Sequence, residues 1–529
     1  MTEIADYDVV ILGAGINGCG AFRDLALQGL RVLLLERGDI CQGASAASSR
    51  LMHGGLKYLE TGEFRLVRES LTERNMLLAT APHYVHPLEC VVPVKSTWGG
   101  IIGSAARFFG IKARLKDRGL VITALGLALY DLYGRALRSM PVHRMLGRRR
   151  LRALLPDIAA DISGAGLYYE AHITHAERLG LELVLDGLAA NPGAQAVTRA
   201  DLCDTTGDVL SWRDAQGRLC KARARVVLNA GGAWIDAVNA RLGIDTHLMG
   251  GSRGSHLVVD SPALLKALDG RMIYFGTPDG RVNLIYPFAG KVLVGATDIA
   301  QGDPDTAACS TDEEAYLLAA VAEVFPDIPV SPNQVAHRFC GVRPLPRATG
   351  DVGSVTRDHS LLTLTLPDST VPVHCLIGGK WTTFRAFAEL ATDRVLADLG
   401  LTRRVSTAGL AIGGGRGFPT TDAARKALCT RLARLGGITE GRAAILLSRY
   451  GTRAEAYALS LRGRGETPLS SLPDHAREEI RHIAATELVG GIDDILYRRT
   501  LIGLTGRDRP EVRTEIAALL EALPQCESA

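Results

Sequence analysis

The sequence predicts an α/β fold in which a nucleotide-binding domain, assembled from separate segments, alternates with a second domain that also contains a sheet. Three observations predict it. A glycine-marked strand, helix and strand span residues 8–36, and two further strands followed by glycines appear at 225–232 and 374–380. From residue 420 on, the pattern is helical and rich in Ala, Leu, Arg and Glu.

The first unit begins with an unbroken aliphatic run, Val9 to Leu12, which is typical of a parallel strand buried on both faces. Gly13, Gly15 and Gly18 follow with the spacing G-x-G-x-x-G. The first glycine permits a tight turn, the second lets the backbone approach a pyrophosphate, and the third allows close helix packing. A second strand ends at Glu36, which is placed to accept hydrogen bonds from a ribose 2′-hydroxyl. The unit therefore predicts an adenine dinucleotide without a 2′-phosphate.

Two later segments repeat the order of strand, glycines and helix. Residues 225–232 lead into AWIDAV, and residues 374–380 lead into a segment with helical periodicity from Ala386 on. Between them, residues 257–260, 282–287 and 291–295 are predicted strands of the second domain. Because the glycine-marked units are far apart, we expect both domains to be discontinuous.

The expected boundaries follow from this interleaving. The nucleotide-binding domain takes about 1–90, 155–245 and 345–400, the second domain takes about 91–154 and 246–344, and a C-terminal helical domain takes 405–529. Residues 412–418, IGGGRGF, are predicted to be a loop or linker, because glycines at this density do not hold regular structure.

Composition excludes some classes of function. At 529 residues the chain exceeds the size of a single core. Its 60 basic and 57 acidic residues give a net charge of +3, which makes no case for nucleic-acid binding. The ten cysteines form no C-x-x-C pair, so we expect reduced thiols in the cytoplasm. The first strand begins so early that a cleavable leader is not expected.

The most apolar stretch, Gly119 to Tyr130, is too short to span a membrane. Basic residues flank it on both sides: Arg107, Lys112, Arg114, Lys116, Arg118, Arg135, Arg138, Arg144, Arg148, Arg149, Arg150 and Arg152. Two interpretations stay open. The segment is either a surface that lies on anionic lipid or a buried helix with solvated flanks.

Residues 41–69, after the second strand, have the composition of a ligand-binding loop. The small residues 43–49 can run backbone close to a ligand, with serine hydroxyls available as hydrogen-bond partners. His53, Lys57 and Tyr58 follow around a pair of glycines. A surface loop is the alternative, but such loops seldom concentrate these residue types.

Arginines gather again at 341–358, where Arg343, Arg347 and Arg357 lie among prolines and glycines. Guanidinium groups bind phosphate or carboxylate through two parallel hydrogen bonds. Together with Lys57 and Lys380, these arginines predict an anion pocket beside the dinucleotide.

A candidate proton acceptor lies on the proposed second domain. His256 is in RGSHLVV, and Thr297 and Asp298 are in VGATDIAQGD. Histidine is suited to accept a proton from a substrate hydroxyl. A strand-end histidine with a purely structural role is the alternative.

With these residues in view, the chain resembles the flavin-dependent, membrane-associated glycerol-3-phosphate dehydrogenases, a branch of the D-amino-acid-oxidase-like flavoproteins. The matching stretches are GAGINGCGAFRDLALQGLRVLLLE, GASAASSRLMHGGLKYLE, EFRLVRESLTER, NAGGAWIDAV, RGSHLVV, VGATDIAQGD, GVRPL, TRDHS and IGGKWTTFR. The stretch HIAATELVGGIDDILYRRT, at 482–500, resembles the C-terminal cap domain of the same enzymes.

The resemblance implies a noncovalent FAD in a fold of the D-amino-acid-oxidase type. It implies oxidation of the secondary hydroxyl of a polyol phosphate, sn-glycerol 3-phosphate to dihydroxyacetone phosphate. A base takes the hydroxyl proton while a hydride passes from the same carbon to the flavin. It also implies a membrane quinone as electron acceptor and a cytoplasmic protein in peripheral contact with the inner face of the cell membrane.

The resemblance also assigns expected roles to residues. The substrate-binding and phosphate-binding positions fall on Lys57, Tyr58, Arg343, Arg357 and Lys380. We expect His256 to be the base, with His53 as the second candidate, and Arg343 and Lys380 to take part in catalysis. The expected flavin contacts are Gly13, Gly15, Asn17, Gly18, Glu36, Arg37, Ser45, Ser48, Ser49, His53, Gly54, Gly55, Ala230, Gly231, Gly378, Gly379, Lys380, Trp381 and Thr382.

Three departures from the family pattern leave the substrate open. Lys57 takes the place of the arginine in the usual family motif Gly-Gly-Leu-Arg-Tyr. The stretch NAGG at 229–232 replaces the usual Asn-Ala-Thr-Gly, and Arg347 adds a positive charge to the predicted anion pocket. A longer alditol phosphate such as erythritol phosphate, or an oxygen-using oxidase, stays as an alternative. An RNA-modifying flavoprotein is disfavoured, because basic and aromatic residues do not alternate. The oligomeric state, with a homodimer as one option, stays open.

Overall fold

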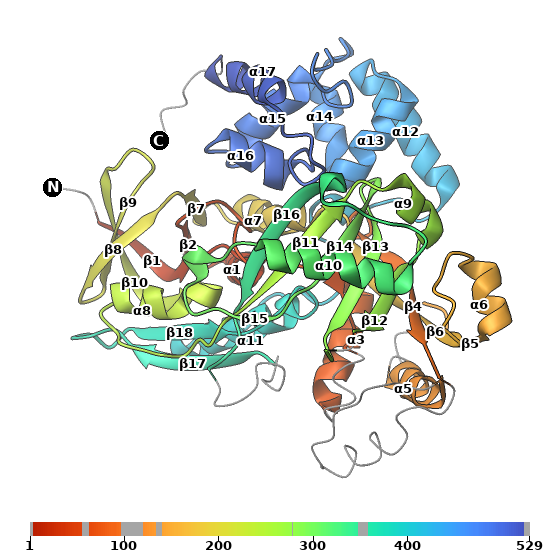
Figure 1. Ribbon diagram of the computed structural model, residues 1–529. Helices are drawn as coiled ribbons and strands as arrows, with labels where there is room; N and C mark the ends of the chain where they lie inside the picture. The colour runs from red at the N-terminus through yellow and green to blue at the C-terminus, as the bar shows by residue number, and fades with distance from the viewer. Residues whose placement is uncertain are drawn as a thin grey trace.

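The computed structural model of the protein describes residues 4–55, 63–96, 120–133, 140–277, 279–347 and 358–522. Within this part of the chain the strands form two sheets, and the C-terminal helices gather at one end of the molecule (Figure 1). The α/β fold with a helical C-terminal region, predicted from the sequence, is confirmed.

The first sheet contains the predicted nucleotide-binding unit. β1 (Ile4–Leu12) pairs in parallel with β2 (Val32–Glu36) and with β10 (Leu219–Asn229). β10 in turn pairs in parallel with β18 (Pro372–Ile377). The sheet is completed by β7 (Gln195–Thr198), β8 (Asp201–Thr206), β9 (Val209–Arg213) and β17 (Ser360–Thr365). The three glycine-marked strands therefore belong to one sheet, with β10 between β1 and β18, although they are far apart in the sequence.

Both faces of this sheet are covered, which explains the unbroken aliphatic run of β1. Val9 and Ile11 pack into a core with α1 (Ile16–Leu27), α7 (Ala176–Ala190) and α11 (Phe384–Asp398). Val10 and Leu12 pack on the other side, into a core shared with α8 (Ile235–Arg241) and β9. Because successive residues point to opposite faces, a strand buried on both sides needs apolar residues at every position.

The second sheet has the order β15-β11-β14-β13-β12-β4-β6-β3, with β16 beside β11 and β5 beside β6. Its strands are β3 (Leu51–Met52), β4 (Val85–Val94), β5 (Arg144–Gly147), β6 (Gly164–Ile173), β11 (Ser252–Val259), β12 (Met272–Gly276), β13 (Val282–Phe288), β14 (Lys291–Gly295), β15 (Ile299–Ala300) and β16 (Val335–Arg343). The predicted strands at 257–260, 282–287 and 291–295 are all in it.

The sheets divide the chain differently from the expected boundaries at two places. β3 and the first part of β4 fall in the expected segment 1–90, and β6 falls in 155–245, yet all three belong to the second sheet. The physical reason is pairing: β4 and β6 are antiparallel partners over their whole length, from Val85 opposite Ile173 to Val94 opposite Gly164. A strand's local sequence does not show which sheet it joins.

Helices α3 (Phe64–Thr80), α5 (Leu120–Tyr133), α6 (Arg148–Leu154), α9 (Pro262–Leu268) and α10 (Thr311–Val324) accompany the second sheet. In α5, Leu127 and Tyr130 are buried against the sheet, whereas Leu125 and Leu132 are 65% and 58% exposed. One face of this helix is therefore buried against the sheet and the other is exposed, and the lipid-facing interpretation stays a prediction. Within the described residues, no helix is both long and apolar enough to cross a membrane.

The C-terminal region contains α12 (Asp422–Gly436), α13 (Glu440–Tyr450), α14 (Ala454–Ser460), α15 (Arg477–Thr486), α16 (Ile492–Asp494) and α17 (Pro510–Glu521). The glycine-rich stretch before it is irregular apart from one turn, as predicted, but its glycines Gly413, Gly414 and Gly415 are buried. Its backbone is fixed by carboxylates of α7: Gly413 N donates to Asp186 and Gly414 N donates to Glu182, each at 3.0 Å. This stretch is a packed connection.

Replacing Gly414 with alanine tests this packing. A Cβ at Gly414 would lie 2.1 Å from the carbonyl oxygen of Tyr450, a backbone atom that cannot rotate away. We expect Gly414→Ala to reduce the free energy of unfolding by about 1–3 kcal/mol, as overpacking typically does, and to lower the Tm. The matched control is Gly441→Ala in α13, where the nearest atom to the new Cβ is 4.0 Å away. Equal Tm values for the two variants would contradict the close contact.

Candidate active site

A cavity of about 1230 Å³ opens where the two sheets meet. Its wall includes the β1–α1 turn, the loop after β2, the turn after β10, the turn after β18 and strands of the second sheet. It is larger than the roughly 300–1,000 Å³ typical of pockets for one small molecule. Its size and position suit a dinucleotide together with a second, smaller ligand.

The glycines of the β1–α1 turn differ in what they do. Gly13 has a φ of +105°, and a Cβ at Gly18 would lie 2.0 Å from the carbonyl oxygen of Gly13, so both are required by the turn itself. A Cβ at Gly15 would meet only Ser45 Oγ, at 3.5 Å, and Gly15 lines the cavity. The protein atoms around Gly15 would therefore tolerate a side chain at this position. Because glycine has none, there is room for a ligand beside the N-terminus of α1.

Glu36 lies at the end of β2, on the cavity wall. Its carboxylate accepts hydrogen bonds from Ala14 N at 2.6 Å and Gly38 N at 2.7 Å, one on each oxygen. Burial raises the pKa of this carboxyl, and the two backbone donors oppose the shift. Because each carboxylate oxygen has a second lone pair, the group can still accept bonds from a ribose.

Three distant segments are tied together around the glycine turn. Ser45 Oγ accepts from Ile16 N at 3.0 Å, and the carbonyl oxygen of Ser45 accepts from Trp381 Nε1 at 3.0 Å. Asn17 Nδ2 donates to the carbonyl oxygen of Gly378 at 3.1 Å. The serine loop, the glycine turn and the turn at 378–382 thus form one wall of the cavity. Residues of all three are predicted flavin contacts, and contact with one flavin requires that they lie together. Ala230 and Gly231 also line the cavity, as does Ser48.

The loop at His53 is fixed from behind by a buried polar cluster. Gly54 N donates to Glu170 Oε2 at 2.9 Å and to the hydroxyl of Tyr130 at 3.1 Å. Arg74 donates to both of these acceptors, and the pair Arg74–Glu170 is buried. Thr382 Oγ1 donates to the carbonyl oxygen of His53 at 3.3 Å. Sequence reasoning missed this cluster.

His256 lies on β11 and faces the cavity. Its Nε2 is 2.7 Å from Ser49 Oγ, and its ring stacks on Phe339 with centroids 4.9 Å apart. Burial, and then the guanidinium groups of Arg343 and Arg50, lower the pKa of His256 to about 3. The ring is therefore neutral at physiological pH, which is the form that accepts a proton.

Arg343 is positioned by three acceptors. Its guanidinium donates to Thr297 O at 3.0 Å and to both Ser252 Oγ and Asp298 Oδ1 at 3.2 Å. It lies across Gly254, where a Cβ would be 2.2 Å from Nη2. Arg343 lines the cavity that also contains His256, so the structure brings these two predicted residues together.

Of the other cations predicted for the anion pocket, some line the cavity and some do not. Lys380 lines the cavity and donates to Ser70 Oγ at 3.2 Å. Arg347 is exposed and is not among the residues that line the cavity. The structure therefore does not place Arg347 in the predicted anion pocket: Pro346 lines the cavity, but Arg347, the next residue, is exposed. Lys57, Tyr58 and Arg357 lie outside the described residues.

Arg37, predicted as a cofactor contact, also forms an unpredicted ion pair. This ion pair connects the loop after β2 to Asp305, which follows β15 of the second sheet. Arg37 Nη2 is 2.6 Å from Asp305 Oδ1, and Arg37 Cζ lies over the ring of Trp234, 5.0 Å from its centroid. Trp234 Nε1 also donates to Asp305, at 2.9 Å. All three line the cavity. Nothing in the local sequence of Asp305 signals this role, because its partners are far away along the chain.

The cavity wall carries polar groups that the chain itself does not satisfy. Asn17 Oδ1 and His256 Nδ1 are buried and have no hydrogen-bond partner among the residues that the structure describes. Such atoms are costly unless a ligand or water supplies the bond. Together with the room at Gly15, they fit a bound dinucleotide and substrate.

Comparison with known proteins agrees with this geometry. Residues 8–394 match the model of the family described as FAD dependent oxidoreductase, and residues 405–524 match the C-terminal domain of alpha-glycerophosphate oxidase. A glycerol-3-phosphate dehydrogenase of Synechocystis is 33% identical over 95% of this chain and 90% of its own length. One from Pseudomonas aeruginosa is 32% identical over 96% of this chain and 94% of its own length.

Two further relatives are informative. A D-erythritol 1-phosphate dehydrogenase of Brucella abortus is 33% identical over 75% of this chain and 74% of its own length. The crystal structure of a glycerol-3-phosphate dehydrogenase from Bacillus halodurans, complexed with FAD, aligns with a TM-score of 0.72 at 22% identity over 98% of this chain and 91% of that one. The latter supports the fold.

The family match covers both the glycine turn and the walls of the large cavity, and it identifies the dinucleotide as FAD. The chain belongs to the family of FAD-dependent oxidoreductases, in the group that carries the C-terminal domain of alpha-glycerophosphate oxidase.

Proposed function

We propose that the protein oxidises sn-glycerol 3-phosphate to dihydroxyacetone phosphate and passes the electrons to a membrane quinone. The observation that carries this proposal is that one cavity combines the glycine turn, the neutral His256 and the guanidinium of Arg343. The first can hold a dinucleotide, the second can accept a proton, and the third can bind a phosphate. The relatives named above as glycerol-3-phosphate dehydrogenases support this choice of substrate.

The residues that would hold FAD are those of the wall formed by the turns at 13–18, 45–49 and 378–382, with Glu36 at the ribose. When bound, FAD supplies an acceptor for the hydride that leaves the carbon of the alcohol. The chain must bring that carbon close to the cofactor and exclude water from the site. The division of the chain into cofactor and substrate domains is likewise part of this proposal.

His256 takes the hydroxyl proton in this scheme. Its Nε2 is held by Ser49, and its Nδ1 has no hydrogen-bond partner in the described part of the chain. A Cβ at Gly295 would lie 2.1 Å from His256 Cδ2, so the opposite strand leaves the ring just enough space. These contacts fix the plane of the imidazole, which general-base catalysis requires.

Arg343 and Lys380 bind the phosphate in this scheme. Asp298 neutralises part of the Arg343 charge, and the contacts with Ser252, Asp298 and Thr297 hold the guanidinium at the cavity. A guanidinium is the group best suited to bind a phosphate through parallel hydrogen bonds. Lys57, Tyr58 and Arg357 stay predicted members of the same pocket.

Erythritol phosphate is the second candidate substrate. The relative named as a D-erythritol 1-phosphate dehydrogenase is as similar, over its matched region, as those named for glycerol 3-phosphate. An extra carbon with its hydroxyl preserves the chemistry at the reacting carbon and lengthens the ligand.

Peripheral membrane contact is the remaining part of the proposal. The exposed Leu125 and Leu132 of α5 lie in a part of the chain whose sequence is rich in arginine, including the exposed Arg148, Arg149 and Arg150 of α6. Apolar side chains beside cations suit the surface of an anionic bilayer, where quinones are available.

Turnover of a panel of alditol phosphates tests the substrate. We expect glycerol 3-phosphate to give the highest kcat/KM with a quinone analogue as acceptor, and the four-carbon and five-carbon alditol phosphates to give lower values. Turnover of erythritol phosphate alone would replace the first choice by the second. Stoichiometric release of peroxide in air would identify an oxidase instead.

The variant Arg343→Ala tests the anion site. Loss of a charge-assisted hydrogen bond of about 1.5–3 kcal/mol predicts a KM for glycerol 3-phosphate roughly 10-fold to 100-fold higher, with FAD retained. FAD content is read from the visible spectrum. The matched variant His256→Asn should instead lower kcat with little change in KM. Loss of FAD from Arg343→Ala would show that Arg343 serves the cofactor.

Salt dependence tests the membrane contact. Each basic side chain near an anionic surface contributes about 1 kcal/mol, and this attraction is screened by salt. We therefore expect the FAD-bound protein to float with phosphatidylserine vesicles at low salt and to be released at high salt. Retention that salt does not alter, abolished by Leu125→Asp, would assign the contact to apolar insertion.

A further inference from the structure

A second cavity, of about 380 Å³, lies where three parts of the chain meet. Its wall is formed by His175 at the start of α7, by residues 289–291 between β13 and β14, and by residues of the C-terminal region, among them Arg449 and Arg507. None of its lining residues also lines the large cavity. It is therefore a separate space.

The charged groups on its wall are unbalanced. Among the described residues the charged side chains that line it are Lys291, Arg449, Arg499, Arg507 and Asp474. The other carboxylates that pair with these cations do not line the cavity. Glu479 is fully buried beyond Arg449, and Asp39 is buried beyond Arg499. Lys291 pairs with Asp260, which also does not line the cavity. Among the described residues, four cations and one carboxylate therefore line it, so the lining itself presents an excess of positive charge.

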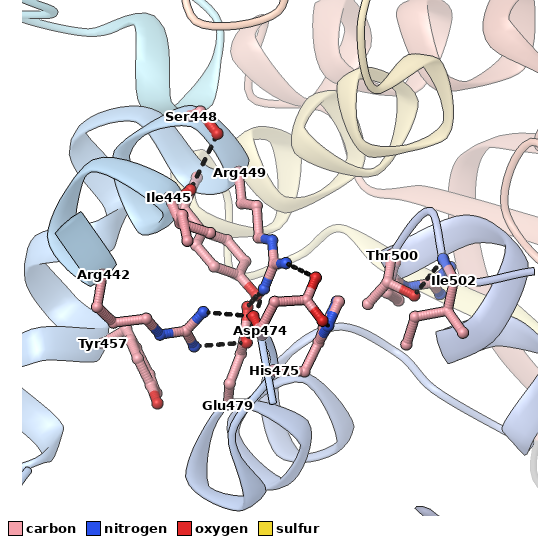
Figure 2. Close-up of polar contacts among 12 residues, drawn as sticks. Arg442, Ile445, Ser448, Arg449, Tyr457, Asp474, His475, Glu479, Thr500 and Ile502 are labelled. Atoms are coloured by element: carbon pink, nitrogen blue, oxygen red, sulfur yellow. Dashed lines mark hydrogen bonds and ion pairs between the residues drawn. The ribbon is translucent and has the colours of Figure 1, made fainter. Parts of the chain in front are cut away.

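The arginines are held in place by their ion pairs. Glu479 accepts from Arg449 Nη1 at 2.9 Å on both oxygens and from Arg442 at 2.7 Å. Asp474 lies 3.5 Å from Arg449 and 3.3 Å from His475 (Figure 2). It also lies 2.8 Å from Arg507. Two guanidinium groups are thus fixed around a single half-exposed carboxylate, which lowers the entropic cost of binding a further anion.

The environment of His175 agrees with this charge distribution. Its pKa is lowered well below the usual value, first by burial and then by Arg178, Arg449 and Arg50, which are all cations. A neutral imidazole can still donate one N–H to a ligand. Thr505, which accepts from Arg507 Nε at 3.1 Å, is a further polar group on the wall.

We propose that this cavity binds a small anion that carries a phosphate group, such as pyrophosphate or a phosphorylated metabolite of a few carbons. Its volume is at the lower end of small-molecule pockets, about 300–1,000 Å³, and is much smaller than that of the cofactor cavity. Arginine and lysine together at such a site favour phosphate over a neutral ligand. The site is independent of the identity of the polyol substrate.

The position of the cavity predicts what the anion does. Arg499 on its wall pairs with Asp39 at 2.8 Å, and Asp39 belongs to the loop after β2 that also lines the cofactor cavity through Gly38 and Gln42. An anion bound between the C-terminal region and the β13–β14 turn links these parts. We expect it to stabilise the FAD-bound protein, because a ligand that binds only the folded state raises the Tm.

Calorimetry and thermal unfolding with pyrophosphate test the proposal on the FAD-bound protein. The test variants are Arg507→Gln and Lys291→Gln, at two different edges of the cavity. The matched control is Arg513→Gln. Arg513 is about as exposed as Arg507 (39% and 36%), and it does not line the cavity. Like Arg507, which pairs with Asp474, it pairs with aspartates of the C-terminal region, Asp493 and Asp508. We expect binding to weaken by about tenfold or more in each test variant and to be unchanged in the control.

The variant Arg343→Ala separates this site from the catalytic cavity. Pyrophosphate binding that survives Arg343→Ala but not Arg507→Gln supports the second site. Binding lost in Arg343→Ala and kept in both test variants places the anion in the catalytic cavity and overturns the proposal. The proposal also fails if pyrophosphate does not bind, or if only vesicles with phosphatidic acid bind in an Arg507-dependent way, which would assign the cations to a lipid headgroup.

Discussion

The structure depends on the close approach of three backbone turns at the end of the first sheet. The carbonyl oxygen of Gly13 lies 2.0 Å from where a Cβ of Gly18 would be, and that of Ala230 lies 2.8 Å from where a Cβ of Gly13 would be. Gly379 in the third turn has a φ of +84° and packs directly on Asn17. Backbone atoms cannot rotate away from a side chain, so only glycine permits this convergence. It places the start of α1 and the ends of β10 and β18 around one cavity.

Buried ion pairs then fix the other parts of the chain relative to that end of the sheet. Arg50 pairs with Glu177, Arg74 with Glu170, Arg178 with Glu487 and Arg499 with Asp39, and all eight side chains are nearly inaccessible to water. Removal of one partner would leave an uncompensated buried charge, which costs about 3–5 kcal/mol. The last two pairs connect the C-terminal helices to α7 and to the loop after β2. The helical region is therefore part of the framework around the cofactor cavity.

The features predicted correctly from the sequence are those set by neighbouring residues. Val9 to Leu12, the glycine turn and Glu36 specify one strand, one turn and one acid within a short segment, and the structure contains all of them. The features that were missed depend on partners far away. Gly54 is held by Tyr130 and Glu170, Arg37 by Asp305, and β6 is assigned to its sheet by β4. No local pattern encodes such pairs. The outward position of Arg347 was missed for the same reason.

The electrostatics of the large cavity connect substrate binding to proton transfer. His256 is kept neutral by burial and by the positive charges of Arg343 and Arg50, so in the absence of substrate it is a weak base. In the proposed reaction a phosphate dianion binds beside Arg343 and offsets part of that positive charge. An anion near an imidazole favours its protonated form, so the pKa of His256 rises when substrate binds. The contact that selects a phosphorylated substrate therefore also strengthens the base that acts on its hydroxyl. A neutral polyol of the same length neither binds Arg343 as an anion nor raises the pKa of His256. In the proposed reaction the site therefore disfavours it both in binding and at the chemical step.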